Sequence, residues 1–275
     1  MHITITPPEV PIFYNDFISF TAGGYTGFGH PQIIENLKSN FSDIIIKNPP
    51  RENVLKSKPN LIYKVTLPQK PLFPFSQVAV KICNPRNVIK RLLSPLQDSK
   101  AERSFSAARH LIANSLDTPF PLAFLEKRKN GFITESYYIA EYIDDYVKIR
   151  DYLRENPENY KEIKEMILAV SDYVKRMHGS DMVHRDLNLA NFLLSGKGKK
   201  KRLVLVDLNR YRMHKKISPF RRVVDIGRLY WGKHRPEFFQ AYSGEDKKIK
   251  KWQRFFNFYY SWRKKRKRLK KLLKK

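Results

Sequence analysis

A nine-residue stretch from Val183 to Asn191 contains the residue types that phosphate transfer from ATP requires. It reads VHRDLNLAN and fits the pattern H-R-D-L-x-x-x-N at every fixed position. In this pattern the Asp accepts the proton of the attacking hydroxyl, and the Asn five residues later turns back to hold a metal ion on the ATP phosphates. We therefore predict Asp186 as the catalytic base and Asn191 as a metal ligand.

A second carboxylate and a lysine complete the expected site. Asp207, in VDLN, follows Asn191 by sixteen residues and ends a hydrophobic segment. It stands where D-F-G stands in kinases, although the Phe and the Gly are replaced, and we expect it to be the second metal ligand. Lys81 ends VAVK, a match to the strand whose Lys pairs with the α- and β-phosphates. Glu102, in the following helix, is the best candidate to hold Lys81 in place.

The segment expected to cover the phosphates departs from the usual pattern. Val54 to Asn60 lies where G-x-G-x-x-G belongs, yet it contains no glycine. Lys56 and Lys58 are expected to reach the phosphates by charge instead of by backbone amides. An ordinary basic turn is the alternative interpretation of the same residues.

The hydrophobic pattern supplies the elements that must position these side chains. Short β-branched runs predict strands at residues 61–65 and 78–82, and apolar residues at helical spacing predict a helix at 99–114. Two more strands, at 121–126 and 136–143, are predicted on either side of the hairpin turn signal at Asn130–Gly131. A long helix from Tyr160 to His178 follows, with Gly179 as its C-cap. Strands at 192–194 and 203–206 come next, and the remainder is expected to be helical. This order predicts an α+β, two-lobed protein-kinase-like fold with a small β-rich N-lobe and a truncated helical C-lobe.

The chain divides into four expected parts. Residues 1–50 are interrupted by Pro and Gly and are predicted to be an N-terminal extension of irregular structure. Residues 51–143 are the expected N-lobe and residues 144–243 the expected C-lobe. Residues 244–275 are a tail in which aromatic residues alternate with dense Lys and Arg.

Composition limits the class of protein. With 275 residues, 41% of them hydrophobic, the chain is long and apolar enough for one two-lobed domain or two small ones. The single cysteine excludes an internal disulfide framework and a CxxC metal site. We find no secretory signal and no uncharged apolar run near the length of a bilayer span, so we expect a cytoplasmic protein that is soluble or bound to a membrane surface. A formal net charge of +28 attracts polyanions such as nucleic acid, anionic lipid or a phosphorylated glycan.

The spacing after Asp207 bears on the acceptor. Asp225 follows Asp207 by only eighteen residues, and no A-P-E follows. This leaves no room for the long activation segment with which protein kinases dock a peptide. A small molecule or a glycan is the expected acceptor.

Several segments resemble the lipopolysaccharide core kinases, the Kdo and heptose kinase family of Gram-negative bacteria. HRDLNLANFLL and LVLVDLNRYRM carry the resemblance most strongly, and SKAERSF before TPFPLAF and the late VVDIGRLYW are similar too. The resemblance covers about residues 54–235. It implies ATP and Mg²⁺ as cofactors, Asp186 as the base, Lys81 as the phosphate clamp and Asn191 and Asp207 as magnesium ligands. It also implies that Asp225 steadies the catalytic loop from a buried helix.

The same resemblance implies the acceptor and the place of action. The acceptor is a hydroxyl of Kdo or heptose in lipid-linked core oligosaccharide, and the sequence does not say which sugar. Such a kinase works peripherally on the cytoplasmic face of the inner membrane. We expect the aromatic and basic tail to dock on that anionic surface. A solubilising tail, or a tail that merely attracts nucleic acid, is the alternative interpretation.

Other functions remain open on the residues alone. Another small-molecule kinase of the same fold, of the aminoglycoside or choline phosphotransferase type, is the first alternative, and a protein kinase comes after it. A pseudokinase or basic binding protein is kept open by the missing glycines and the altered D-F-G. No module for specific binding of nucleic acid is recognisable, and the oligomeric state is not predicted.

Overall fold

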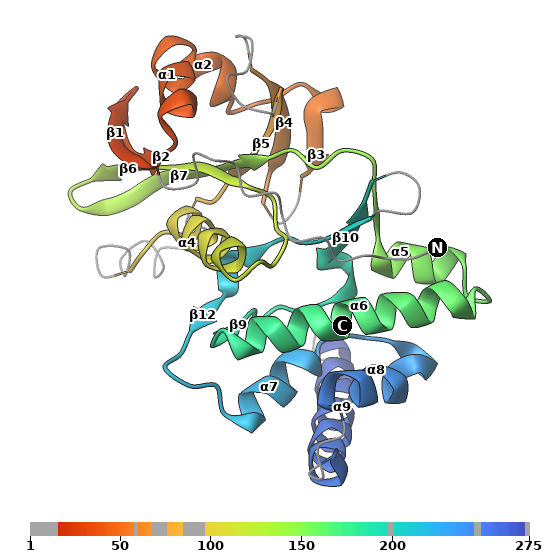
Figure 1. The fold of residues 1–275 in the computed structure, drawn as a ribbon. Helices are drawn as coiled ribbons and strands as arrows, with labels where there is room; N and C mark the ends of the chain where they lie inside the picture. The colour runs from red at the N-terminus through yellow and green to blue at the C-terminus, as the bar shows by residue number, and fades with distance from the viewer. Residues whose placement is uncertain are drawn as a thin grey trace.

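The structure is a computed structural model that describes residues 16–57, 60–67, 76–84, 97–196, 201–244 and 249–272. A mostly β N-lobe lies above a mostly helical C-lobe in the view of Figure 1. Each lobe has a large cluster of buried hydrophobic side chains of its own. The predicted two-lobed α+β architecture is confirmed.

A seven-stranded antiparallel sheet forms the N-lobe. Its strand order is β1-β2-β6-β7-β5-β4-β3. Helices α1 (Pro31–Ser39) and α2 (Phe41–Ile44) lie on one face, and α4 (Lys100–Ala113) lies on the other, between the sheet and the C-lobe (Figure 1). The strands are β1 (Ile18–Ala22), β2 (Tyr25–Gly29), β3 (Val54–Lys56), β4 (Ile62–Thr66), β5 (Gln77–Ile82), β6 (Pro121–Lys129) and β7 (Phe132–Glu141); a 3₁₀ turn, η1 (Arg51–Asn53), precedes β3.

Two sequence signals fixed α4 and the β6–β7 hairpin correctly. The Ser99 hydroxyl caps α4 by accepting a hydrogen bond of 2.9 Å from the Glu102 N–H, as serine does at an N-cap. Asn130 and Gly131 join β6 to β7 with φ values of 52° and 80°. Two positive φ values in a row are what a tight type I′ hairpin turn needs, which Asn-Gly provides at low cost.

Residues 16–50 are not irregular, contrary to the prediction for this extension. β1 pairs with β2, and β2 pairs with β6, so this segment widens the N-lobe sheet by two strands. Gly27 and Gly29 are required there, because a Cβ on Gly27 would lie 2.2 Å from the Phe124 carbonyl oxygen and one on Gly29 would lie 2.7 Å from the Ala123 Cβ. The glycines that suggested a loop therefore serve close packing of β2 on β6.

Short strands, 3₁₀ turns and one long helix build the part of the C-lobe that carries the site. α6 (Tyr160–Gly179) buries the predicted stripe of Ile163, Met166, Val170, Val174 and Met177. Its C-cap is Ser180, one residue after the predicted Gly179. The neighbouring elements are β8 (Tyr146–Lys148), α5 (Ile149–Glu155), β9 (Met182–Val183), η3 (Leu189–Asn191), β10 (Phe192–Ser195), β11 (Arg202–Leu205), η4 (Leu208–Arg210) and β12 (Arg212–Met213).

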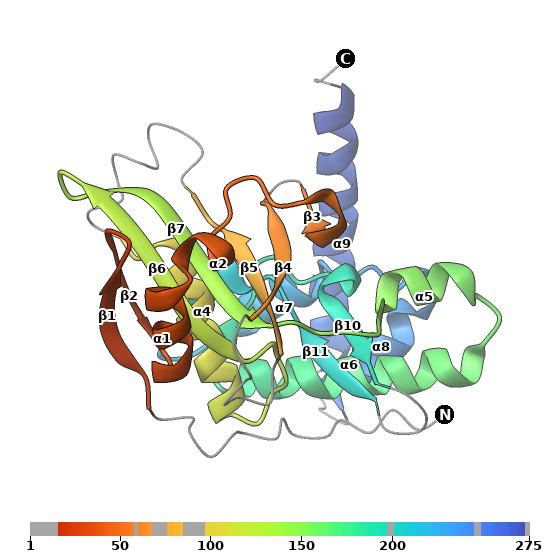
Figure 2. The same cartoon turned by 90° about the horizontal axis from the view of Figure 1, so that it is seen from above.

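Three helices and a 3₁₀ turn complete the C-lobe: α7 (Pro219–Ile226), η5 (Gly232–His234), α8 (Arg235–Ser243) and α9 (Ile249–Leu272). The first half of α9 belongs to the C-lobe core, since Phe256 is 1% exposed and packs on Phe239 at 5.1 Å between ring centroids. The second half extends away from the body of the molecule (Figure 2). Among the described helices, none has both the length and the apolar character that crossing a bilayer requires.

Candidate functional site

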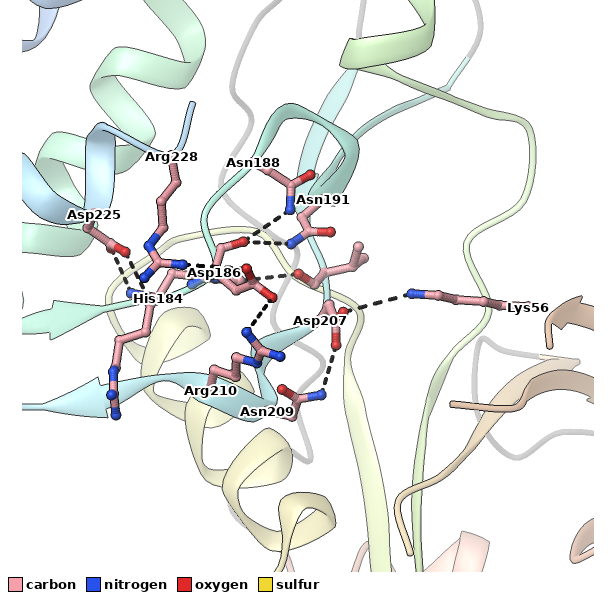
Figure 3. A network of polar contacts seen from close by, with 12 residues as sticks. Lys56, His184, Asp186, Asn188, Asn191, Asp207, Asn209, Arg210, Asp225 and Arg228 are labelled. Atoms are coloured by element: carbon pink, nitrogen blue, oxygen red, sulfur yellow. Dashed lines mark hydrogen bonds and ion pairs between the residues drawn. The ribbon is translucent and has the colours of Figure 1, made fainter. Parts of the chain in front are cut away.

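The H-R-D motif forms a tight loop between β9 and η3. The Asp186 carbonyl oxygen accepts hydrogen bonds of 3.1 Å from the side-chain amides of Asn188 and Asn191 (Figure 3). Arg185 takes a φ of 62°, which turns the chain sharply before the predicted base. Because the Asn191 nitrogen is used in this bond, its side-chain oxygen is the atom left to face a cation.

Asp225, on α7, fixes this loop through hydrogen bonds to its backbone. Its carboxylate accepts hydrogen bonds of 2.8 Å from the backbone N–H groups of His184 and Arg185, and it is 2% exposed. Burial opposes its ionisation, but the hydrogen bonds from His178 and from the His184 backbone N–H hold the pKa of Asp225 below its ordinary value. The expectation that Asp225 steadies the catalytic loop is confirmed.

His184 connects the loop to the strand that ends at the second carboxylate. Its Nδ1 accepts from the Asp186 N–H at 3.3 Å, so a neutral ring carries its hydrogen on Nε2 and donates it to the Val206 carbonyl oxygen at 3.3 Å. Burial lowers the pKa of His184, which favours this neutral form. These contacts give His184 a structural role.

Asp207 lies beside the catalytic loop. The Val206 N–H donates to the Asn191 carbonyl oxygen at 2.9 Å, and Asp207 then takes a left-handed φ of 67°. Its carboxylate receives Lys81 Nζ at 2.5 Å on one oxygen and Lys56 Nζ at 3.9 Å on the other. Burial opposes ionisation of Asp207, but the charge and hydrogen bond of Lys81, followed by Lys56, lower its pKa. A carboxylate held ionised in this way is suited to a cation.

A cavity of about 350 Å³ opens between the lobes next to Lys81 and Asp207. Its wall combines apolar side chains of both lobes with the polar groups of the site. The lining includes Ile62, Ala79, Tyr138, Ile143, Leu193 and Val206, together with Lys56, Lys81, Asn191 and Asp207. A cavity whose wall combines apolar and charged groups matches a flat base attached to phosphates.

The structure separates some of the predicted cofactor-binding residues. Lys81 and Lys56 both line the cavity, whereas Glu102 lines a different hollow together with Glu126 and Arg128. Within the described residues no ion pair joins Glu102 to Lys81, whose partner is Asp207, so the predicted role of Glu102 as the anchor of Lys81 has no support. Ser104, two residues after Glu102, is the described residue of α4 that lines the cavity. Lys58 lies outside the described residues.

Sequence reasoning missed two arginines at the base. Arg210 Nη1 lies 3.2 Å from Asp186 Oδ2, and Arg228 Nη1 lies 3.7 Å from Asp186 Oδ1 (Figure 3). Each follows a predicted aspartate by three residues, Asp207 and Asp225 respectively, within segments noted above for their resemblance. That repeated D-x-x-R spacing was the available signal.

Comparisons with known proteins agree with this geometry. The model of the lipopolysaccharide kinase (Kdo/WaaP) family matches residues 83–259, more than half of the chain. Two curated relatives, both named lipopolysaccharide core heptose(I) kinase WaaP and both from Escherichia coli, are 29% and 27% identical over 154 residues. Those residues are 53% of this chain and 58% of each relative, so the chain spans little more than half the length of the relatives it matches.

A solved structure shows the same fold. The chain aligns with WaaP in complex with acyl carrier protein at a TM-score of 0.57 and 19% identity, over 82% of this chain and 95% of that one. The predicted two-lobed, protein-kinase-like fold class is therefore confirmed. From its match to the family model, the chain belongs to the lipopolysaccharide kinase (Kdo/WaaP) family.

Proposed function

We propose that this chain is an ATP-dependent kinase that phosphorylates a hydroxyl of Kdo or heptose in the lipopolysaccharide core. The observation that supports it most is that Lys81, Asn191 and Asp207 line a cavity between the lobes and that Asn191 is hydrogen-bonded to Asp186. Membership of the lipopolysaccharide kinase (Kdo/WaaP) family supports an acceptor in the lipopolysaccharide core. The proposal covers both sugars, Kdo and heptose, as the acceptor.

The residues fit ATP and Mg²⁺. The apolar lining suits the adenine, and Lys81 and Lys56 are the cations positioned for its phosphates. The side-chain oxygens of Asn191 and Asp207 are hard donors of the kind Mg²⁺ prefers, and they come from two loops joined by a backbone hydrogen bond. When bound, the metal ion supplies charge neutralisation on the phosphates. Lys58 stays a proposed phosphate contact from its place in the sequence.

Asp186 is the proposed base. Its backbone is fixed on three sides, by Asn188 and Asn191 at its carbonyl oxygen and by His184 at its N–H. A carboxylate held in one position can accept the hydroxyl proton of the acceptor at hydrogen-bond distance, which is the geometric requirement for general base catalysis. Asp225 acts through the loop and has no contact with the reacting atoms in this scheme.

We assign α9 to the surface of the inner membrane, on the cytoplasmic side. Its outer face carries exposed Phe255, Phe258, Trp262 and Leu269 at spacings of three, four and seven residues, with exposed Lys265 and Arg266 beside them. Aromatic side chains favour the interfacial region and basic ones favour anionic headgroups. The double variant Phe258→Ser, Trp262→Ser should bind anionic vesicles more weakly, as measured by sedimentation. Undiminished binding would contradict this assignment.

The closest competing function is another small-molecule kinase of the same fold, and after it a pseudokinase or basic binding protein. A protein kinase is disfavoured because η4, β12 and α7 occupy most of the path from Asp207 to Asp225. Stabilisation of the protein by magnesium and ATP in a thermal shift experiment separates a kinase from a binding-only protein, since a ligand stabilises the fold that binds it.

The decisive test is phosphate transfer from radiolabelled ATP to purified core-lipid acceptors. We expect label in the glycolipid with the wild-type chain and none with Asp186→Ala. Asp172→Ala, on the exposed face of α6, is the matched control and should retain transfer. Label only in protein would favour a protein kinase, and no label with any acceptor would favour the pseudokinase.

A further inference from the structure

Positive charge exceeds negative charge around the proposed base. Arg210 and Arg228 approach opposite oxygens of the Asp186 carboxylate, at 3.2 Å and 3.7 Å. A third guanidinium, that of Arg263 on α9, donates to the Gly227 carbonyl oxygen at 3.3 Å, one residue before Arg228. Three permanent positive charges thus gather near the two carboxylates of Asp186 and Asp225.

Arg228 is the less solvated of the two arginines, because its side chain is 25% exposed whereas that of Arg210 is 62% exposed. In the part of the chain that the structure describes, the ion pairs of Arg210 and Arg228 are with Asp186 alone. The Nε of Arg228 is buried and has no hydrogen-bond partner among the described residues. Burial and the nearby charge of Arg228 lower the pKa of Arg263. The partly buried positive charge of Arg228 and Arg263 is costly unless an anion joins it.

The arginines lie on the acceptor side of the site. Figure 3 shows Arg210 and Arg228 around Asp186, whereas Lys56 reaches Asp207 from the opposite side. Lys56, Lys81 and Asp207 line the cavity assigned to the nucleotide, and Asp186, Arg210 and Arg228 do not. A group bound by the two arginines would therefore belong to the molecule whose hydroxyl meets Asp186.

The arginines also occupy the oxygens that the reaction needs. A hydroxyl can hand its proton to Asp186 only if one carboxylate oxygen is open to it. An anion on the acceptor would draw the guanidinium groups toward itself, because paired fork-like hydrogen bonds to a carboxylate or phosphate are what arginine makes best.

We propose that Arg210 and Arg228 form a subsite for an anionic group, a carboxylate or a phosphate, carried by the acceptor close to the hydroxyl that is phosphorylated. This inference rests on the proposed function and deepens it. An acidic or already phosphorylated sugar region is then the preferred acceptor, and a neutral sugar of the same shape is a poor one. Arg263 supports the subsite from α9 without touching the acceptor.

The test uses acceptors in pairs that differ only in charge. One pair is a Kdo glycoside and its methyl ester; the other is a heptose glycoside with and without a phosphate monoester. kcat/KM is measured for the wild-type chain, Arg210→Met, Arg228→Met and Arg221→Met. Arg221 is an exposed arginine on α7 and serves as the control. The pair that shows the preference identifies the anion as carboxylate or phosphate.

We expect the wild-type chain to prefer the charged member of one pair. Arg228→Met should lower kcat/KM for that member by about tenfold or more, the scale of a lost charge-assisted hydrogen bond, and reduce the preference itself. Equal losses on charged and neutral members would overturn the subsite, because the arginines would then act on Asp186 or on the transferred phosphate. Absence of any preference in the wild-type chain would overturn it as well.

Failure of the proposed function is recognised separately. If the wild-type chain phosphorylates none of the four acceptors, the kinase assignment fails, while binding of the same four sugars, followed by NMR, still tests the subsite. Tighter binding of a charged member that Arg228→Met removes would support it. Equal binding of charged and neutral members would overturn it.

Discussion

Arg202, on β11 of the C-lobe, donates two hydrogen bonds of 2.9 Å to the two carboxylate oxygens of Asp117, which lies between α4 and β6 of the N-lobe. Its Nη1 donates to Glu141 at the end of β7, at 2.8 Å. The second Glu141 oxygen accepts from the Phe120 N–H at 3.0 Å. One arginine of the C-lobe thus holds two separate segments of the N-lobe beside the nucleotide cavity.

Replacing Arg202 by Met should destabilise the protein markedly. Burial raises the pKa of Asp117 more than Arg202 lowers it, whereas the contacts with Asp117 raise the pKa of Arg202. Arg202 is the cation shared by Asp117 and Glu141, so removing it leaves two buried carboxylates without their common partner. Breaking a buried ion pair costs roughly 3–5 kcal/mol. Because the Arg202 side chain is 37% exposed, we expect about 2 kcal/mol, measured by urea unfolding.

Arg154→Met provides the control for Arg202. Arg154 also pairs with two carboxylates, but its side chain is 72% exposed. Exposed pairs contribute roughly 0–1 kcal/mol, so its unfolding free energy should change little. Equal destabilisation by both variants would show that the contacts of Arg202 hold no special place in the fold.

Asp225→Asn should loosen the catalytic loop. A side-chain amide offers one acceptor oxygen to the two N–H groups of His184 and Arg185 that Asp225 now satisfies. Hydrogen bonds to a charged group contribute roughly 1.5–3 kcal/mol, and we expect a loss of unfolding free energy on that scale. Asp172→Asn, whose carboxylate is exposed on α6, should cost far less in the same urea titration.

The difference in unfolding free energy between the wild-type chain and Asp225→Asn should depend on pH, because the pKa of Asp225 is shifted. Its pKa is lowered in the folded protein, so the unfolded chain binds the proton more readily and the carboxylate stabilises the fold. This stabilisation is fully present above the ordinary Asp pKa of about 3.9 and is lost as the pH falls through the folded value. The gap between the wild-type chain and Asp225→Asn should therefore narrow in acid. A difference in unfolding free energy that stays constant with pH would contradict a stabilising role of the ionised Asp225 carboxylate.

The sequence was informative wherever one residue type determines the local chemistry. The H-R-D loop, the strand lysine Lys81 and the carboxylate Asp207 meet in space because the strands and loops that carry them have strong local signals. The Ser99 cap and the Asn130–Gly131 turn are of the same kind.

The failures came from contacts between distant segments. Residues 16–50 looked like loop because Gly27 and Gly29 are needed only where β2 meets β6, about a hundred residues later. Glu102 was assigned to Lys81 from its position in the helix, yet the direction in which a helical side chain points depends on how the helix packs. Arg202 and Asp117, 85 residues apart, gave no local signal at all.

The two lysines at Asp207 should differ in their effect on nucleotide binding. Lys81 lies 2.5 Å from Asp207 with a side chain that is 9% exposed, and Lys56 lies 3.9 Å away with one that is 42% exposed. Lys81→Met should weaken binding of magnesium and ATP about a hundredfold, the scale of a buried phosphate contact. Lys56→Met should weaken it by about threefold, since solvent screens its charge. Calorimetric titration measures both, and equal effects would contradict the ranking.

Gly227 permits α9 to pack against α7. A Cβ at this position would lie 2.6 Å from Cδ1 of Tyr259 and 3.0 Å from the Val223 carbonyl oxygen, so Gly227→Ala must push α9 outward. Overpacking of this kind costs typically about 1–3 kcal/mol, and the exposed Lys and Arg residues of α9 should become more sensitive to trypsin. Gly179→Ala is the control, because nothing lies within 4 Å of the added Cβ and its backbone is helical.

A double variant separates this clash from a general intolerance of Ala at Gly227. Tyr259→Ala removes the ring that the new Cβ would meet, at its own cost in packing. If the clash with Tyr259 causes the loss, the double variant Gly227→Ala, Tyr259→Ala should lose less unfolding free energy than the two single variants together. Residues in contact couple in this way by roughly 0.5–3 kcal/mol. Strict additivity of the two losses would mean that α9 does not depend on Gly227 for its place beside Arg228.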